Sequence, residues 1–389
     1  MERAELKAWL RLTLTPGVGN DTARKLLAAF GSAEAVFEQS AAALRQLGSD
    51  KLVRAITTEP PKLADLLQTT LDWLASSPDS ADRADRVIAP IGSALYPAPL
   101  LNIEDPPLVL YMMGSQLNRG QYATDLIAKS LAIVGSRNPT PQGEANARQF
   151  AKAFAEQGLC IVSGLALGVD GAAHDGALLG APNDGCATIA VVGTGLDRVY
   201  PKKHLALAHR IAANGLIISE FPIGTPPINA NFPKRNRIIS GLSLGTLVVE
   251  AALKSGSLIT ARLSSEQGKD VFAIPGSIHS PQSRGCHYLI KQGAKLVETA
   301  QDVMEELKIP SAHIFQSSHG DPLREDDEEA PEGDSAFLSA LGFDIVSLDA
   351  LQARTGWPTP ELQAKLLELE LDGFVTRLPG GLYQRMAQS

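Results

Sequence analysis

Short runs of apolar, mostly β-branched residues recur between residues 86 and 308, and they constrain the fold more than any other feature. Each run is apolar throughout instead of alternating with polar residues, which is typical of a strand buried on both faces. Stretches with helical spacing separate the runs, so right-handed crossovers and a parallel sheet follow. The sequence therefore predicts an α/β domain, a Rossmann-like doubly wound parallel sheet. The runs are LVLYM, LAIVG, LCIVSG, TIAVVG, LIISE, GTLVVE and VFAIPG.

Different patterns flank this domain. The apolar residues of 1–85 have helical spacing, which Pro16 to Gly19 interrupts. The interruption resembles the turn of a helix-hairpin-helix. Asn20 and Asp21, which follow it, are candidates to cap the second helix. The interruption either points glycine amides at a DNA phosphate or is a tight turn between packed helices. Residues 336–389 read as helix, turn, helix and two short strands, the layout of a winged helix. We expect a small helical domain at 1–85, the α/β domain at 86–308 and a winged-helix domain at 336–389.

Negative charge is concentrated between the last two domains. Residues 321–334 hold eight carboxylates and one arginine (1 − 8 = −7), although the whole chain has a formal net charge of -8. A stretch rich in Pro, Asp and Glu without apolar periodicity cannot bury enough surface to fold. We therefore expect an acidic flexible linker at 309–335. Residues 129–308 hold 18 Lys and Arg against 14 Asp and Glu (18 − 14 = +4), so the α/β domain is mildly basic.

Several function classes are disfavoured. No run approaches the ~20 apolar residues of a membrane span, and the N-terminus lacks the layout of a signal peptide. We expect a cytoplasmic protein without a membrane partner. The cysteines Cys160, Cys186 and Cys286 have no metal-binding spacing, so we expect no metal site, and Cys160 lies in an apolar run that favours burial.

Glycines and hydroxyls follow the predicted strands. Gly135, Ser136 and Arg137 come after one strand, and Ser163 and Gly164 after the next. Ligands of open parallel sheets bind beyond the carboxyl ends of the strands, where amides and helix N-termini attract anions. Glycines alone would only make tight turns. Together with a nearby cationic stretch they favour a ligand that carries phosphate.

That cationic stretch is NFPKRNRIISG, residues 231–241, where Lys234, Arg235 and Arg237 lie within four positions. If a helix begins here, cations at its N-terminus oppose the helix dipole by ~0.3–1 kcal/mol each. An anionic partner explains that placement better than an ordinary solvated helix start. Phe232 directly precedes the cations and is a candidate for stacking on a base.

The sequence does not contain the motif of a dinucleotide-binding site. In the dinucleotide-binding motif G-x-G-x-x-G, Gly193 and Gly195 match the first two glycines, but Arg198 occupies the position of the third. The P-loop pattern GxxxxGK[ST] is absent from the sequence. We expect no nucleotide cofactor.

Six blocks in order resemble the DNA processing protein A (DprA/Smf) family: AIVGSRNPTPQG, IVSGLALGVDGAAHDGAL, VVGTGLDRVYP, FPKRNRIISGLS, VVEAALKSGSLITARLSSEQGKDVFAIPGS and GCHYLIKQGAKLV. His287 departs from the usual Asn of the last block. The resemblance implies a non-enzymatic, single-stranded DNA-binding protein of natural transformation, without cofactor. It also implies that the protein protects incoming DNA, helps to load the RecA recombinase and forms a homodimer through the α/β domain.

The resemblance implies a set of DNA-binding residues at the strand-end edge. The cations are Arg137, Lys202 or Lys203, Lys234, Arg235 and Arg237; the other members are Gly135, Ser136, Ser163, Gly164, Phe232 and Asn236. Ser257 and Thr260 are secondary candidates, because they either cap a helix or reach a phosphate.

An enzyme is the alternative. The domain is distantly similar to phosphoribohydrolases, whose hallmark is PGGxGTxxE, and a nucleotide-processing activity would follow. Gly245 and Thr246 match, but Pro-Gly-Gly is missing and Glu250 comes one residue late. We expect Glu250 to accept hydrogen bonds structurally, and Asp170 to cap a helix with His174 packed on it or bonded to it.

The second helix of the predicted winged helix is acidic. It carries Glu361, Glu368, Glu370 and Asp372 against Lys365. Such a surface repels duplex phosphates, so a protein contact or a weak accessory role is favoured over reading of the major groove.

Overall fold

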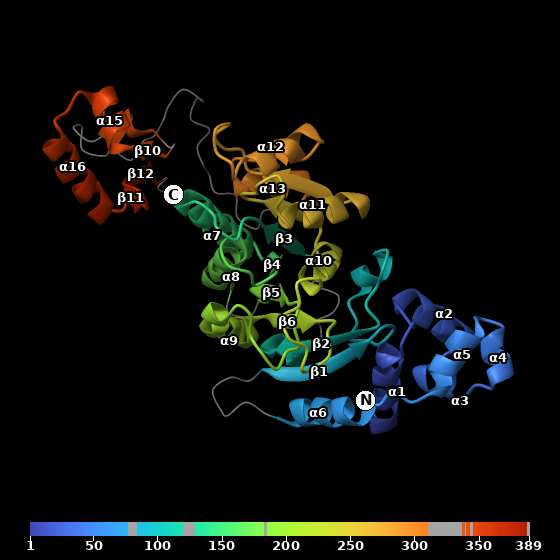
Figure 1. The fold of residues 1–389 in the computed structure, drawn as a ribbon. Helices are drawn as coiled ribbons and strands as arrows, with labels where there is room; N and C mark the ends of the chain where they lie inside the picture. Colours follow the sequence, from blue (N-terminus) through green and yellow to red (C-terminus); the bar gives the residue numbers. More distant parts are fainter. Residues whose placement is uncertain are drawn as a thin grey trace.

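The computed structural model describes residues 1–76, 84–119, 129–182, 185–309, 337–338, 340–342 and 345–386. A nine-stranded sheet with the order β1-β2-β6-β5-β4-β3-β7-β8-β9 forms its centre (Figure 1). All pairs from β6 to β9 are parallel. The predicted α/β class is confirmed. The parallel strands are β3 (Ser130–Val134), β4 (Cys160–Ser163), β5 (Thr188–Val191), β6 (Leu216–Ser219), β7 (Gly245–Val248), β8 (Asp270–Ala273) and β9 (Lys295–Leu296).

Helices cover both faces of this sheet, which is why its strands are apolar throughout. On β3, Leu131 and Ile133 pack against one helical layer, and Ala132 and Val134 against the other. The first layer holds α7 (Pro141–Glu156), α8 (Val169–Gly180), α9 (Leu205–Asn214) and α13 (Ala300–Glu306). The second holds α10 (Asn231–Leu242), α11 (Ser257–Glu266) and α12 (Arg284–Lys291).

One edge of the sheet differs from the prediction. The run LVLYM lies in β2 (Val109–Gly114), which pairs antiparallel with β6 and with β1 (Asp85–Pro90). The expectation of a parallel strand here was wrong. Between β1 and β2 the chain forms only the short 3-10 helix η1 (Ala98–Asn102), without the α-helix that a parallel crossover usually contains. Two strands of this nine-stranded sheet were not predicted: β1, which begins with charged residues, and β9, which has two residues.

The N-terminal helices pack against the antiparallel edge. Trp73 of α6 contacts Tyr111 of β2, with ring centroids 6.2 Å apart. The cap of α2 is Gly19, without a side-chain hydrogen bond. The expected capping by Asn20 and Asp21 is therefore not present. The helices are α1 (Arg3–Leu14), α2 (Asn20–Phe30), α3 (Ala33–Glu38), α4 (Ala41–Arg45), α5 (Asp50–Thr57) and α6 (Leu63–Ala75).

Asn20 and Arg24 instead hold this domain to the α/β domain. Both donate to the Asp105 carboxylate, at 3.0 and 3.2 Å. Asp21 forms an ion pair with Lys25 at 2.8 Å. Arg24 and Lys25, the cations at the start of α2, are thus both paired with carboxylates.

The C-terminal elements form a winged helix with a core of its own. A three-stranded antiparallel sheet with the order β10-β12-β11, where two strands were predicted, packs with α15 and α16 around Leu351, Leu362, Leu366 and Leu369. The elements are β10 (Val346–Ser347), α15 (Leu348–Thr355), α16 (Thr359–Leu371), β11 (Val375–Leu378) and β12 (Leu382–Arg385). The predicted linker at 309–335 lies outside the described residues except for Ile309. In the described part of the chain, none of the helices has the length and apolar character of a membrane span.

Candidate nucleic-acid interface

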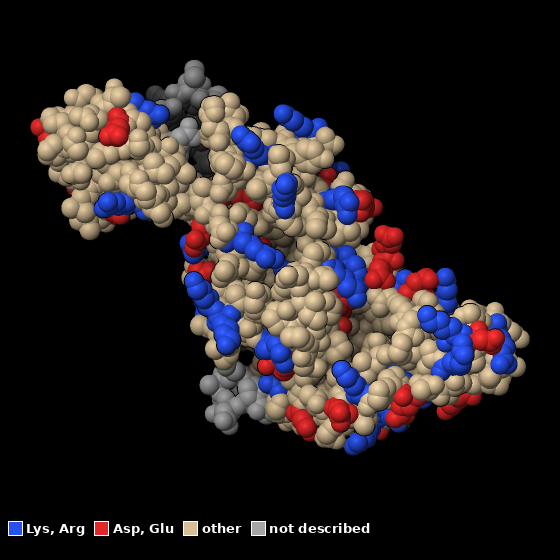
Figure 2. Space-filling view, viewed as in Figure 1, with Lys and Arg blue, Asp and Glu red and all other residues tan. Residues whose placement is uncertain are grey.

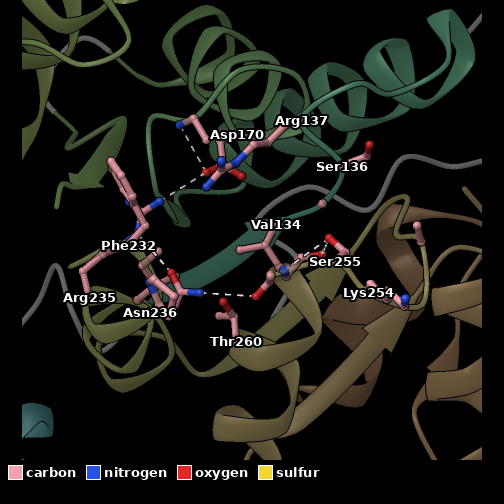
Figure 3. A pocket seen from close by; sticks show the side chains of 17 residues that line it. Val134, Ser136, Arg137, Asp170, Phe232, Arg235, Asn236, Lys254, Ser255 and Thr260 are labelled. Atoms are coloured by element: carbon pink, nitrogen blue, oxygen red, sulfur yellow. Dashed lines mark hydrogen bonds and ion pairs between the residues drawn. The ribbon is translucent and has the colours of Figure 1, made fainter. Parts of the chain in front are cut away.

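A cavity lies where the strand order reverses. Strand β3 has β4 on one side and β7 on the other, so the loops that follow β3 and β7 diverge at their carboxyl ends. Such switch points are where open α/β sheets bind ligands. The cavity has a volume of about 450 Å³, and its walls come from the loops after β3, β4 and β7 and from α10. Figure 3 shows Arg137 and Thr260 on opposite sides of it.

The loop after β3 places Arg137 at the cavity mouth. A Cβ on Gly135 would lie 2.7 Å from Val169 Cγ2, so a larger residue would separate this loop from α8. Ser136 accepts a hydrogen bond from the Asn138 amide at 3.1 Å. Arg137 is exposed, and its guanidinium carbon lies 5.8 Å from the centre of the Phe232 ring. The structure thus brings together two predicted residues that are far apart in sequence.

Only the first turn of α10 reaches solvent. The helix begins at Asn231, Lys234 is exposed, and every residue from Arg235 to Leu242 is buried. Lys234 Nζ lies 3.3 Å from Glu220 Oε2, so its charge is partly balanced. Of the predicted cations on this helix, Lys234 is therefore the accessible one.

Arg235 points inward and binds the ends of the strands. Its Nη1 donates to the carbonyls of Gly164 and Val191, at the ends of β4 and β5, and its Nε donates to Asn236 Oδ1 at 3.0 Å. Asp170 Oδ2 lies 3.9 Å from Nη2. Burial lowers the pKa of Arg235 to about 10, and the Asp170 charge opposes that shift. The side chain is 4% exposed, which leaves little of it for a phosphate.

Arg237 is engaged in the same way at the end of β6. Its Nη1 and Nη2 donate to the two carboxylate oxygens of Glu220 at 2.6 and 2.7 Å, and its Nε donates to the Asp105 carbonyl at 2.8 Å. The sequence predicts that an anionic ligand balances the cations of this stretch. Instead, the partly buried Glu220 and the buried Asp170 supply the negative partners, so the helix-dipole argument for a ligand does not extend to Arg235 and Arg237.

Ser163 and Gly164 serve the packing of α10. Ser163 is fully buried and donates to the Ile133 carbonyl at 2.7 Å. A Cβ on Gly164 would lie 2.1 Å from Arg235 Nη2, and a Cβ on Gly193 3.0 Å from the Phe232 ring. These glycines give Arg235 and Phe232 their places on the strand ends, a role that the sequence did not indicate.

A second aromatic residue joins Phe232. The ring of Tyr200 lies 5.5 Å from that of Phe232 at an interplanar angle of 32°, and Tyr200 is 48% exposed. Lys202 and Lys203 follow in the short helix η3 (Lys202–His204), exposed and without an ion pair in the described part of the chain. We call Tyr200 and Phe232 the aromatic platform. Sequence reasoning missed Tyr200, although its position two residues before Lys202 was a usable signal.

The opposite wall of the cavity is formed by the loop after β7 and the start of α11. Lys254, also missed, is exposed there and has no ion pair among the described residues. Ser257 Oγ lies 2.6 Å from Ser255 Oγ. Asn236 donates to the Gly256 carbonyl at 3.3 Å, so it joins α10 to this loop. Ser257 and Thr260 both line the cavity.

The three residues that could suggest acid-base chemistry have structural partners. Asp170 lies within α8 and accepts from the Ala166 amide at 3.3 Å, and burial raises its pKa while Arg235 opposes that shift. The cap of α8 is Gly168 without a side-chain hydrogen bond, so the expected capping by Asp170 is wrong. His174 Nδ1 bonds to Thr188 Oγ1 at 2.7 Å. Glu250 accepts from Thr140 N at 2.9 Å and Oγ1 at 2.6 Å, which confirms its structural role.

Accessible cations lie at the cavity, where Arg137 and Lys254 line it, and on the neighbouring segments. In Figure 2, Lys and Arg lie on both sides of a hollow over β3 and α10. We call the accessible set the cationic rim: Arg137, Lys202, Lys203, Lys234 and Lys254. Within the described ranges, no cluster of three or more His, Cys, Asp or Glu side chains is arranged to hold a metal ion.

The fold places this chain in the class of mostly parallel α/β proteins, here flanked by a small helical domain and a winged helix. Residues 87–308 match the family described as DNA recombination-mediator protein A. Residues 3–59 match a DprA-like N-terminal HHH domain, and residues 322–381 a DprA winged helix domain. The chain belongs to the DNA recombination-mediator protein A (DprA/Smf) family.

Two relatives and one solved structure support the membership of this chain in the family. "Protein Smf" of Escherichia coli is 39% identical over 83% of this chain and 82% of its own length. "DNA processing protein DprA" of Streptococcus pneumoniae is 45% identical over 55% of this chain and 71% of its own length. The X-ray structure of that protein has a TM-score of 0.62 and 36% identity, and covers 79% of this chain and 98% of that one.

Proposed function

We propose that this protein binds single-stranded DNA along the cationic rim and the aromatic platform, without catalytic turnover. The observation that carries the proposal is the approach of Arg137 to Phe232, which joins the loop after β3 to the first turn of α10. Cations that follow a sugar-phosphate backbone, together with aromatic faces for bases, are what sequence-independent single-strand binding requires. Arg235 and Arg237 are left out of the proposed contacts, because both are paired within the protein.

Single strands fit this surface better than duplex DNA. The platform offers ring faces, and in a duplex the bases are stacked on one another, so their faces are covered. The cavity beside the platform is concave and of the size of small-ligand sites, about 300–1,000 Å³. An unpaired strand can place a base on Tyr200 or Phe232 while its phosphates meet the cationic rim.

Titration of a fluorescein-labelled oligothymidylate, with unlabelled duplex and ATP as competitors, tests the proposal. We expect unlabelled single strands of any sequence to displace the probe, and duplex and ATP to displace it poorly. Efficient displacement by ATP, or strong preference for one sequence motif, would contradict the proposal. For the enzyme alternative the readout is base release from nucleoside monophosphates, which we expect to be absent.

The family resemblance extends the proposal to a cellular role. In that role the protein acts in the cytoplasm during natural transformation, protects incoming single strands from nucleases, helps to load RecA and works as a homodimer. Sedimentation should then give twice the chain mass of 41.2 kDa. Added protein should slow nuclease digestion of single strands and speed the assembly of RecA on them. A monomeric mass at all concentrations would exclude the dimer and leave the DNA-binding proposal standing.

A further inference from the structure

We infer that the start of α11 is a second phosphate site, across the cavity from Arg137. The site consists of Lys254, Ser255, Ser257 and Thr260, and we call it the α11 subsite. This inference rests on the proposed function and adds to it a defined contact for one phosphodiester of the bound strand.

Thr260 gives the first reason. It is 1% exposed, lines the cavity, and has no hydrogen-bond partner among the described residues. Threonine within a helix often bonds to the carbonyl four residues earlier. Here that carbonyl belongs to Gly256 and accepts from Asn236 and from the Ile259 amide instead. Thr260 Oγ1 is not one of the fully buried side-chain atoms that lack a partner, so the hydroxyl borders the cavity with its bonding capacity free. A ligand oxygen in the cavity is the partner that this position suggests.

The charges around Thr260 give the second reason. Lys254 is exposed and unpaired within the described ranges, and α11 begins three residues after it without an acidic residue in its first turn. Lys254 and the first residue of α11, Ser257, both line the cavity, so the lysine and the positive end of the helix dipole both favour an anion in it. Asp170, the carboxylate that lines the cavity, is partnered by Arg235 on the α10 side. The α11 wall itself carries no acid.

The geometry of the cavity connects the two sites. Arg137 and Thr260 stand on opposite walls, with Phe232 on a third side (Figure 3). A strand that crosses the cavity would place one phosphate against Arg137 and another against the α11 subsite, with the intervening nucleotide beside Phe232. A free nucleoside monophosphate offers the same tetrahedral oxyanion. The cationic rim also includes Lys202 and Lys234, which are exposed and do not line the cavity, and these further cations favour a strand over a single nucleotide.

The test measures affinity of the full chain for labelled oligothymidylate at several salt concentrations. We expect Lys254→Ala to weaken binding about tenfold and to make the slope of log K against log[salt] shallower by about 0.7, the value for one phosphate of a single strand. Thr260→Val removes the hydroxyl at nearly constant volume. It should weaken binding about fivefold at an unchanged slope, since no charge is lost. Thr260→Ser, which restores the hydroxyl, should bind like the parent.

Matched controls separate the possible results. Lys129→Ala removes an exposed lysine that directly precedes β3, at the amino end of a strand whose carboxyl end borders the cavity, and should change neither affinity nor slope. Parental affinity and slope in both Lys254→Ala and Thr260→Val, with weakened binding in Arg137→Ala, would overturn the α11 subsite and leave the proposed function intact. Failure of the parent to bind would overturn both. If Lys254→Ala weakens competition by dTMP but not oligothymidylate binding, the site serves free nucleotides and its assignment to a strand is overturned.

Discussion

At the scale of single residues, neighbouring cations on α10 have opposite surroundings. Lys234 is exposed, while Arg235 is 4% exposed and bonded to two strand-end carbonyls. Arginine suits this second position because its planar guanidinium donates in several fixed directions at once. Burial therefore decides which charges remain available to a polyanion, and the number of cations in the stretch NFPKRNR overstates that availability.

Substitutions at Arg137 and Phe232 should separate the charge contribution to DNA binding from the stacking contribution. Arg137→Ala should weaken oligothymidylate binding by about 1.5–3 kcal/mol and make the salt slope shallower by about 0.7. Phe232→Ala should weaken it by about 1–3 kcal/mol at an unchanged slope, because a ring releases no counterion. Fluorescence anisotropy across a salt series measures both quantities, with Phe232→Trp as the control that keeps a ring. Equal slopes for Arg137→Ala and the parent would remove Arg137 from the phosphate contacts.

His174 should make the protein sensitive to acid. Burial, with the charges of His204 and Arg235, lowers its pKa to about 3 from 6.5. Between pH 6.5 and 3 the unfolded chain therefore binds a proton that the folded chain does not, and the free energy of unfolding falls as the pH falls. The contribution is about 1.4 kcal/mol per pH unit. Denaturant titrations at pH 7, 6 and 5 should show a weaker pH dependence for His174→Gln. An identical dependence in both proteins would assign the acid sensitivity to other groups.

At the scale of elements, α10 rests on the ends of β4 and β5. The glycines at these ends leave room for Arg235 and for the Phe232 ring, and Arg237 fixes the helix to Glu220 after β6. Three strands thus hold one helix, and its first turn carries Phe232 and Lys234 to the rim. The position of the proposed binding surface depends on this packing more than on the charges themselves.

Gly164→Ala tests that dependence. The added Cβ would lie 2.1 Å from Arg235 Nη2, and the buried guanidinium can yield only by giving up its carbonyl partners. We expect a loss of about 1–3 kcal/mol in the free energy of unfolding, together with weaker oligothymidylate binding at an unchanged salt slope. Gly19→Ala, where nothing lies within 4 Å of the new Cβ, is the control for stability. Parental stability in Gly164→Ala would show that α10 is not held by this contact.

At the scale of the whole molecule, charge is segregated along the chain. The formal net charge is -8, yet the cationic rim lies on a domain segment with a balance of +4, 18 Lys and Arg against 14 Asp and Glu. The winged helix differs again, because α16 exposes Glu361, Glu368 and Glu370. Its Lys365 pairs with Glu368 at 3.0 Å. A polyanion would meet attraction at the rim and repulsion at α16.

The winged helix should therefore not increase the affinity of the protein for duplex DNA. Replacing Glu361, Glu368 and Glu370 together by Gln should leave oligothymidylate affinity unchanged and raise duplex affinity, because the repulsion of duplex phosphates is reduced. Competition assays with both DNA forms measure this, and Lys7→Ala, a distant surface change, serves as the control. A fall in duplex affinity in the Gln variant would mean that α16 contacts duplex DNA through these side chains.

Local patterns were sufficient for the class of each domain. A buried strand is apolar on both faces and a helix repeats every 3.6 residues, so the parallel core and the winged helix could be predicted from spacing alone. The orientation of β2 could not, because it depends on the partner that the strand meets, and the two-residue β9 carries no readable pattern.

For the site, the sequence by itself determined the edge of the sheet, the cationic stretch and the ring of Phe232. Tertiary structure alone decided that Arg235 and Arg237 are paired inside the protein, that Tyr200 lies beside Phe232, and that Lys254 and Thr260 face Arg137 across the cavity. The physical reason is that composition fixes how many charges and rings a segment contains, whereas the packing of distant segments fixes which of them water, and hence a ligand, can reach.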